Sequence, residues 1–205
     1  MHVLLAFLIS VIYSLSLFAV DPVLLNCIET PEIHDIDEKP KSFNSSNNLR
    51  RKPGAPDVAL GELIHIVGRI VDVNCLPIQN AAVSIWHANA CGYDNNDNKR
   101  DPSFAGSGRF ITNNLGYYNF ITVMPGTSGD RAPHINFLVQ HPDFPEFTTQ
   151  MFFGDYNDNN CADPVLKASG LASLLIAPLS YNDQGTKTYT FNITLNRENR
   201  FSGKK

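Results

Sequence analysis

The chain is 205 residues long and 43% of it is apolar, which is enough for one domain with a hydrophobic core. Its formal net charge is only -4, so the charge balance does not point to nucleic acid or to an anionic membrane as a partner. We therefore expect no binding to nucleic acid.

The N-terminus carries an almost uninterrupted apolar run, Val3–Val20, which is followed by Asp21 and a polar stretch. An apolar core of this kind, with a small residue such as Ala19 near its end, is typical of a secretory signal peptide. The run is also close to the lower length limit for crossing a bilayer, so the alternative interpretation is an uncleaved membrane anchor. We expect residues 1–19 to be a signal peptide or N-terminal anchor and the protein to be exported, either to a periplasm or out of the cell.

Four cysteines follow this segment: Cys27, Cys75, Cys91 and Cys161. In an exported protein an even number of cysteines permits two disulfides, with three possible pairings. The alternative is free thiols in a reducing compartment. The spacing contains no CxxC pair, which argues against a zinc site.

Composition divides the rest of the chain into two parts. Residues 20–57 are rich in Asn, Ser, Pro and charged side chains, and this predicts a polar arm or linker. From residue 58 the composition changes, and the chain contains short runs of β-branched and aromatic residues separated by turn signals. We expect residues 58–205 to form one folded domain.

The apolar runs of this domain are short and none has a long helical period, which predicts an all-β fold, an antiparallel β-sandwich of about seven to nine strands. In the last run, polar and apolar residues alternate with the period of a half-buried strand. Residues 171–176 fit either a helical turn or another strand, and the Asn- and Asp-rich stretch 155–160 is expected to be a surface loop. The predicted strands are Leu63–Val73, Val83–Trp86, Tyr117–Val123, Ile135–Val139, Phe147–Phe153 and Thr188–Leu195.

A series of motifs in this domain resembles the framework of the intradiol ring-cleavage dioxygenases. The order and spacing of the motifs carry the resemblance, which covers roughly residues 58–195. The motifs are Gly61–Ile70 (GELIHIVGRI), Asn80–Trp86 (NAAVSIW), Phe104–Arg109 (FAGSGR), Gly116–Phe120 (GYYNF), Arg131–Ile135 (RAPHI) and Thr149–Phe153 (TQMFF).

The resemblance implies a mononuclear non-haem ferric site held by two tyrosines and two histidines, a catechol-type aromatic substrate and O2. Fe(III) is a hard cation that favours anionic oxygen, and a metal ion can deprotonate a phenol whose free pKa is about 10. Related enzymes assemble from paired subunits, so the resemblance also implies assembly as a homo-oligomer or with a partner subunit.

Carried over position by position, the ligand set is only partly present. His134 matches the first histidine ligand, but Asn136 stands where the second histidine is expected, and Ser128 stands where one tyrosine is expected. Tyr93 is the candidate for the remaining tyrosine, displaced by one residue, so that Asp94 occupies the expected place. The candidate metal ligands are therefore Tyr93 and His134, with Asp94 and Asn136 as weaker candidates.

The resemblance also implies a role for two further residues, at positions where family members stabilise the substrate and the charge on its ring. Arg131 and Gln150 are the candidate catalytic residues. The alternative is that Arg131 is a surface ion-pair partner and Gln150 a solvated strand residue, with no part in catalysis. His87 and Cys91 lie just before the loop that carries the displaced tyrosine, and either could replace a missing ligand.

These residues leave two interpretations of function open. The first is an intradiol dioxygenase with a rearranged ferric site. The second is a catalytically inactive relative that serves as an exported module for binding a small molecule or a protein. A weaker third option is another divalent metal held by Asp94, His134 and Asn136, with a hydrolytic or carrier role.

Overall fold

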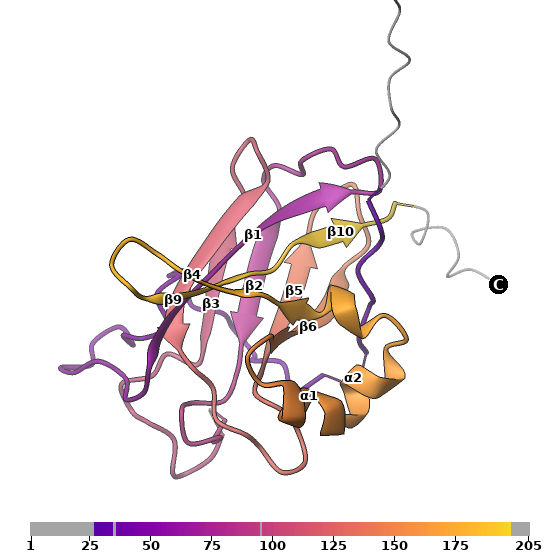
Figure 1. Ribbon diagram of the computed structural model, residues 1–205. Helices are drawn as coiled ribbons and strands as arrows, with labels where there is room; N and C mark the ends of the chain where they lie inside the picture. The colour runs from indigo at the N-terminus through magenta and orange to yellow at the C-terminus, as the bar shows by residue number, and fades with distance from the viewer. Residues whose placement is uncertain (1–26, 35, 95, 198–205) are drawn as a thin grey trace, which may run out of the picture.

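The computed structural model describes residues 27–34, 36–94 and 96–197, and these form two stacked β-sheets with a small helical segment at one end (Figure 1). The predicted β-sandwich is confirmed. The first sheet contains β1 (Leu63–Asp72), β4 (Tyr117–Val123), β8 (Leu179–Tyr181), β9 (Lys187–Thr190) and β10 (Ile193–Leu195). The second contains β2 (Ala82–Trp86), β3 (Ser107–Ile111), β5 (His134–Gln140), β6 (Phe147–Phe153) and β7 (Ile176–Ala177).

Strand β1 organises the first sheet. It pairs antiparallel with β4 along one edge, and parallel with β9 and then β10 along the other, so the sheet is mixed. Burial alternates along β1, and Ile64, Ile66 and Ile70 point into the core between the sheets. This is the pattern expected of a strand with one buried face.

The sequence patterns locate most strands closely. The predicted bounds of β4 and β6 are those of the structure. The predicted strand Thr188–Leu195 is divided into β9 and β10, because the Asn192 side chain accepts the backbone N–H of Arg69 (3.0 Å) and interrupts the ladder. The strands β3 and β8 were not predicted, and β8 is only three residues long. The stretch 171–176, expected to be a helical turn or a strand, contains a 3-10 turn and ends at the first residue of the two-residue β7.

Strand β5 is buried on both faces, and its two faces meet different surroundings. Ile135, Phe137 and Val139 belong to the core between the sheets. Because side chains alternate along a strand, His134 and Asn136 lie on the opposite face. In the register of the sheet Asn136 pairs with Trp86 of β2 and with Gln150 of β6, so these three side chains form a row across neighbouring strands.

The arm that precedes the sandwich is bound along its surface. A disulfide joins Cys27 to Cys75, in the turn after β1, while Cys91 and Cys161 are free and exposed. Backbone hydrogen bonds then tie Ile33 to the edge of β6 and Leu49 to β4. Both of these arm residues are buried, so the arm packs against the sandwich as a strap although its composition is polar.

The helices α1 (Asn157–Ala162) and α2 (Pro164–Ala168) follow β6, and a 3-10 turn at Ala172–Leu174 leads into β7. The stretch expected to be a surface loop at 155–160 thus contains the start of α1. None of the helices in the described ranges has the length and apolar character needed to cross a bilayer. The expected signal segment lies outside the described residues.

Candidate functional site

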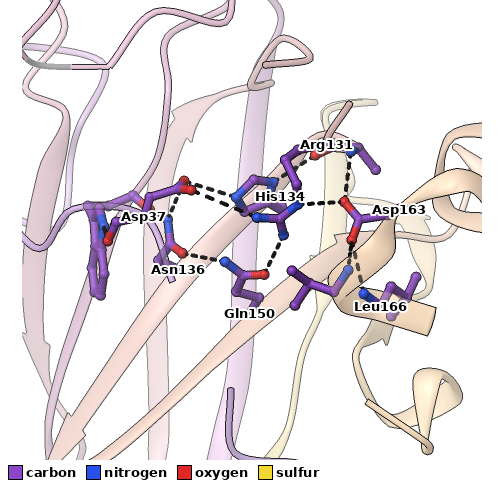
Figure 2. Close-up of polar contacts among 10 residues, drawn as sticks. Asp37, Arg131, His134, Asn136, Gln150, Asp163 and Leu166 are labelled. Atoms are coloured by element: carbon purple, nitrogen blue, oxygen red, sulfur yellow. Dashed lines mark hydrogen bonds and ion pairs between the residues drawn. The ribbon is translucent and has the colours of Figure 1, made fainter. Parts of the chain in front are cut away.

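His134 opens β5 beneath the arm, and both of its ring nitrogens are engaged. Nδ1 lies 2.7 Å from the carbonyl oxygen of Ala132, and Nε2 lies 2.9 Å from Oδ2 of Asp37 on the arm. A carbonyl and a carboxylate can only accept, so each contact is a hydrogen bond when the ring nitrogen concerned carries a proton. Asp37 and His134 form an ion pair when the ring is protonated, and Figure 2 shows their contact within a larger polar network.

Asp37 is held as a carboxylate by its surroundings. Partial burial alone would raise its pKa, but the hydrogen bond and the charge of His134, the amide of Asn136 and the charge of Arg131 together lower the pKa to about 2. Oδ2 accepts from Asn136 Nδ2 at 3.0 Å, while Arg131 Nη1 lies 4.0 Å from Oδ1. The backbone carbonyl of Asp37 also accepts from Trp86 Nε1 at 3.3 Å.

The network continues from Asn136 through the two predicted catalytic residues. Gln150 Nε2 donates to Asn136 Oδ1 at 2.8 Å, and Arg131 Nη2 donates to Gln150 Oε1 at 2.7 Å (Figure 2). Asn136 and Gln150 are fully buried. The structure brings Arg131, His134, Asn136 and Gln150 together, and each is hydrogen-bonded to another residue of the group or to Asp37.

Arg131 is anchored from the far side by Asp163, whose side chain is fully buried. One carboxylate oxygen accepts from Arg131 Nε and from the backbone N–H of Ala132, both at 2.9 Å. The other oxygen caps α2 by accepting from the N–H groups of Val165 and Leu166. Burial would raise the pKa of Asp163, but the hydrogen bonds from Leu166, Arg131 and Ala132 and the charge of Arg131 lower it overall, so the group stays ionised.

A cavity of about 520 Å³ adjoins this network. His134 and Asp37 lie in its wall, and so does Ser128, which stands at a position where the family resemblance would place a tyrosine. The wall combines charged residues of the arm and of the 87–106 loop with small and aromatic residues. Its other members include Lys39, Lys41, Trp86, His87, Ala88, Asp94, Ala105, Gly106 and Gly126.

Tyr93, the predicted tyrosine ligand, is not in the wall of this cavity. Asn89 fixes a tight turn in which its Oδ1 accepts the backbone N–H groups of both Cys91 and Tyr93. Gly92 sits in that turn with φ +80°, a conformation that favours glycine. The Tyr93 ring lies under the ammonium group of Lys99, 5.6 Å from it. Asp94 does reach the cavity wall, where its Oδ1 accepts from the backbone of the next turn.

His87 is a buried structural histidine in this fold. Its Nδ1 lies 2.7 Å from the carbonyl oxygen of Ala88, and its Nε2 lies 2.8 Å from Oγ1 of Thr122. Burial lowers the pKa of His87 to about 4, so the ring is neutral at ordinary pH and both nitrogens have partners. Cys91 is exposed and is not in the cavity wall.

Comparison with known proteins decides the family. A family model described as Dioxygenase matches residues 39–197. This chain belongs to the intradiol ring-cleavage dioxygenase family. It is 35% identical over 175 residues to a Rickettsia typhi protein that carries a provisional dioxygenase name, covering 76% of this chain and 84% of that protein. It is also 36% identical over 115 residues to the protocatechuate 3,4-dioxygenase beta chain of Burkholderia cepacia, covering 50% of this chain and 48% of that one.

Solved structures agree on the fold. An intradiol ring-cleavage dioxygenase from Tetranychus urticae superposes with a TM-score of 0.66 at 22% identity, over 83% of this chain and 96% of that one. A 3-chlorocatechol 1,2-dioxygenase from Rhodococcus opacus superposes with a TM-score of 0.63 at 16% identity, over 85% of this chain and 74% of that one.

The family generally uses Fe(III), and the residues around His134 do not fit that ion. Across residues 27–34, 36–94 and 96–197, no three His, Cys, Asp or Glu side chains are grouped so that they could share a metal ion. His134 and Asp37 offer strong donors and Asp94 is also in the cavity wall, whereas Asn136 is a neutral amide and Ser128 a neutral hydroxyl. Iron at Nε2 would also have to displace the contact with Asp37.

Sequence reasoning missed two members of the network, Asp37 and Asp163. An aspartate directly before Pro164 fits the start of a helix, and that signal could have located Asp163. No comparable signal marks Asp37, because it lies in the polar arm, 97 residues from His134 in the sequence. The ring of Trp86 packs edge-on against Phe43 of the arm, with ring centroids 5.7 Å apart.

Proposed function

We propose that this chain is a member of the dioxygenase family that binds a small molecule in the cavity beside His134 without cleaving aromatic rings by the ferric route. The ion pair between Asp37 and His134 carries this proposal. It occupies the nitrogen with which the histidine would bind a metal ion, and no tyrosine lies in the cavity wall formed by the described residues. Loss of even one ligand weakens a metal site severely, and here several are replaced.

Ring cleavage of a catechol-type substrate with O2 is the second candidate. The family membership supports it, and so does the hydrogen-bonded Arg131–Gln150 pair, which belongs to the same network as His134 in the cavity wall. The two candidates differ in one respect that can be measured. A ferric dioxygenase consumes O2 as it opens the ring, whereas a binding module only retains the aromatic compound.

The test uses catechol and protocatechuate as probes. After incubation with ferric salt, we expect the protein to consume no more O2 than iron in buffer does. Saturable binding of a probe should shift the amide resonances of Gly106 and Gly126 in the cavity wall. O2 uptake that is abolished by His134→Ala would show the second candidate to be right.

We also propose that the protein is exported. The apolar run Val3–Val20 supports this proposal, as does the disulfide between Cys27 and Cys75, because structural disulfides persist in oxidising compartments. Fractionation of the producing cells, with the N-terminus of the recovered protein sequenced, tests both export and cleavage. Recovery of the whole chain with the soluble cytoplasmic proteins would contradict the proposal.

A further inference from the structure

The arm presents one carboxylate to a set of donors that belongs entirely to the sandwich. His134 Nε2 and Asn136 Nδ2 both donate to Oδ2 of Asp37, at 2.9 and 3.0 Å. Arg131 Nη1 lies 4.0 Å from Oδ1, so positive charge faces the second oxygen (Figure 2). Two hydrogen bonds and a nearby guanidinium make a cradle of the kind that binds carboxylates.

These donors are held in place by contacts that do not involve Asp37. His134 is oriented by the carbonyl of Ala132, and Asn136 is oriented by Gln150. Arg131 is fixed by Asp163 and Gln150. If the arm carboxylate were withdrawn, the donors would keep their orientation. His134 Nε2 would lose its acceptor, while Asn136 Nδ2 would keep only the carbonyl oxygen of Trp86 at 3.2 Å. Buried donors without an acceptor cost free energy, so the cradle would favour another anion in the same place.

Asp37 itself is less firmly surrounded than its partners. It belongs to a stretch of the arm without helix or strand, and 42% of its side chain is exposed, against 7% for His134. Both residues line the cavity of about 520 Å³, so the cradle opens onto a space that can hold a small molecule.

We propose that Arg131, His134 and Asn136 form a carboxylate-binding subsite, which Asp37 fills as an internal ligand and which a small carboxylate entering from the cavity takes in its place. This subsite rests on the proposed binding function and names the chemical class of its ligand. The tethered Asp37 competes at a high effective concentration, so an external carboxylate needs further contacts within the cavity. The remainder of such a ligand has room alongside Trp86 and Ala105.

Chemical rescue tests this subsite in the full chain. In Asp37→Ala the internal ligand is removed, and we expect about 0.1 M sodium formate or acetate to raise the melting temperature by on the order of 3 °C relative to sodium chloride at equal ionic strength. The wild type and Glu38→Ala, altered at the neighbouring arm residue, should not respond. Asp37→Ala combined with His134→Ala should also lose the response, because a principal donor is gone.

Each result has a defined meaning. An equal rise with chloride, or with neutral acetamide, would overturn the proposal, and so would a flat response of Asp37→Ala. If Asp37→Ala does not fold alone, refolding yield becomes the readout: recovery in formate but not chloride supports the subsite, and equal failure in both overturns it. Ring cleavage by the wild type would contradict the proposed function alone, since the rescue reports only on the carboxylate cradle.

Discussion

The Asp37 carboxylate of the arm accepts a hydrogen bond from Nε2 of His134 at 2.9 Å, across 97 residues of sequence. This contact belongs to a hydrogen-bonded network. Gln150 donates to Asn136, Arg131 donates to Gln150, and Asp163 at the start of α2 accepts from Arg131. Residues that the family resemblance assigns to the site are thus joined in one network, and His134, the expected metal ligand, is paired with Asp37.

Asp163 should be the member of this network on which stability depends most. Its buried carboxylate accepts four hydrogen bonds, and Asp163→Ala would leave Arg131 without its closest charge partner. We expect a loss of about 3 to 5 kcal/mol in the free energy of unfolding, measured by urea denaturation. Asp158→Ala in the exposed first turn of α1 is the control and should change stability by less than about 0.5 kcal/mol. A similar effect of both variants would contradict the assignment.

Stability should fall as the pH is lowered from 6.5 towards 4, because of His87. Its folded-state pKa is about 4, whereas the unfolded chain takes up the proton near 6.5. Between these values the unfolded state binds more protons, so acid favours unfolding by up to about 3 kcal/mol. The loss caused by Asp37 sets in only as the pH falls to about 3.8, where an aspartate of the unfolded chain takes up its proton, and is therefore separate. Urea denaturation at pH 7 and pH 4.5 measures the difference.

The matched variant for that experiment is His87→Asn, which cannot titrate in this range. It should be less stable than the wild type at pH 7, since Thr122 and the turn at Ala88 lose a fitted partner. Its stability should depend less on pH between 6.5 and 4. An unchanged pH dependence would show that another group is responsible.

The disulfide between Cys27 and Cys75 should contribute to stability by closing a long loop. The two cysteines are 48 residues apart, which corresponds to about 4 kcal/mol from the entropy of the unfolded chain. Cys27→Ser with Cys75→Ser should lose most of this stability in thermal unfolding. Thiol titration of the unreduced protein should detect Cys91 and Cys161 only. Four reactive thiols before reduction would contradict the pairing.

Two substitutions beside His134 should create a ferric site. Asn136→His adds an imidazole on the same face of β5 as His134, and Ser128→Tyr adds a phenol at the cavity wall. We expect the double variant to bind ferric ion with the visible colour of an iron–tyrosinate bond. Ser128→Phe with Asn136→His lacks the phenol and should show no such colour. Failure of the double variant to bind iron would mean that these positions do not converge on one ion.

Most strands were predictable because their signals are local, whereas the contact between the arm and His134 was not. Alternation and turn residues located β4 and β6 to the residue. The last predicted strand was divided by a single side chain, Asn192, which replaces a ladder bond. Composition described the arm correctly as polar but carried no information on where it would bind. Asp37 therefore emerged only from the three-dimensional structure.

Metal content after refolding of the wild-type chain with excess ferric salt, together with its visible spectrum, tests the central claim most directly. With Nε2 of His134 paired to Asp37 and no tyrosine in the cavity wall of the described chain, we expect a colourless protein that retains no stoichiometric iron after desalting. One bound iron per chain with a strong tyrosinate charge-transfer band would contradict the account.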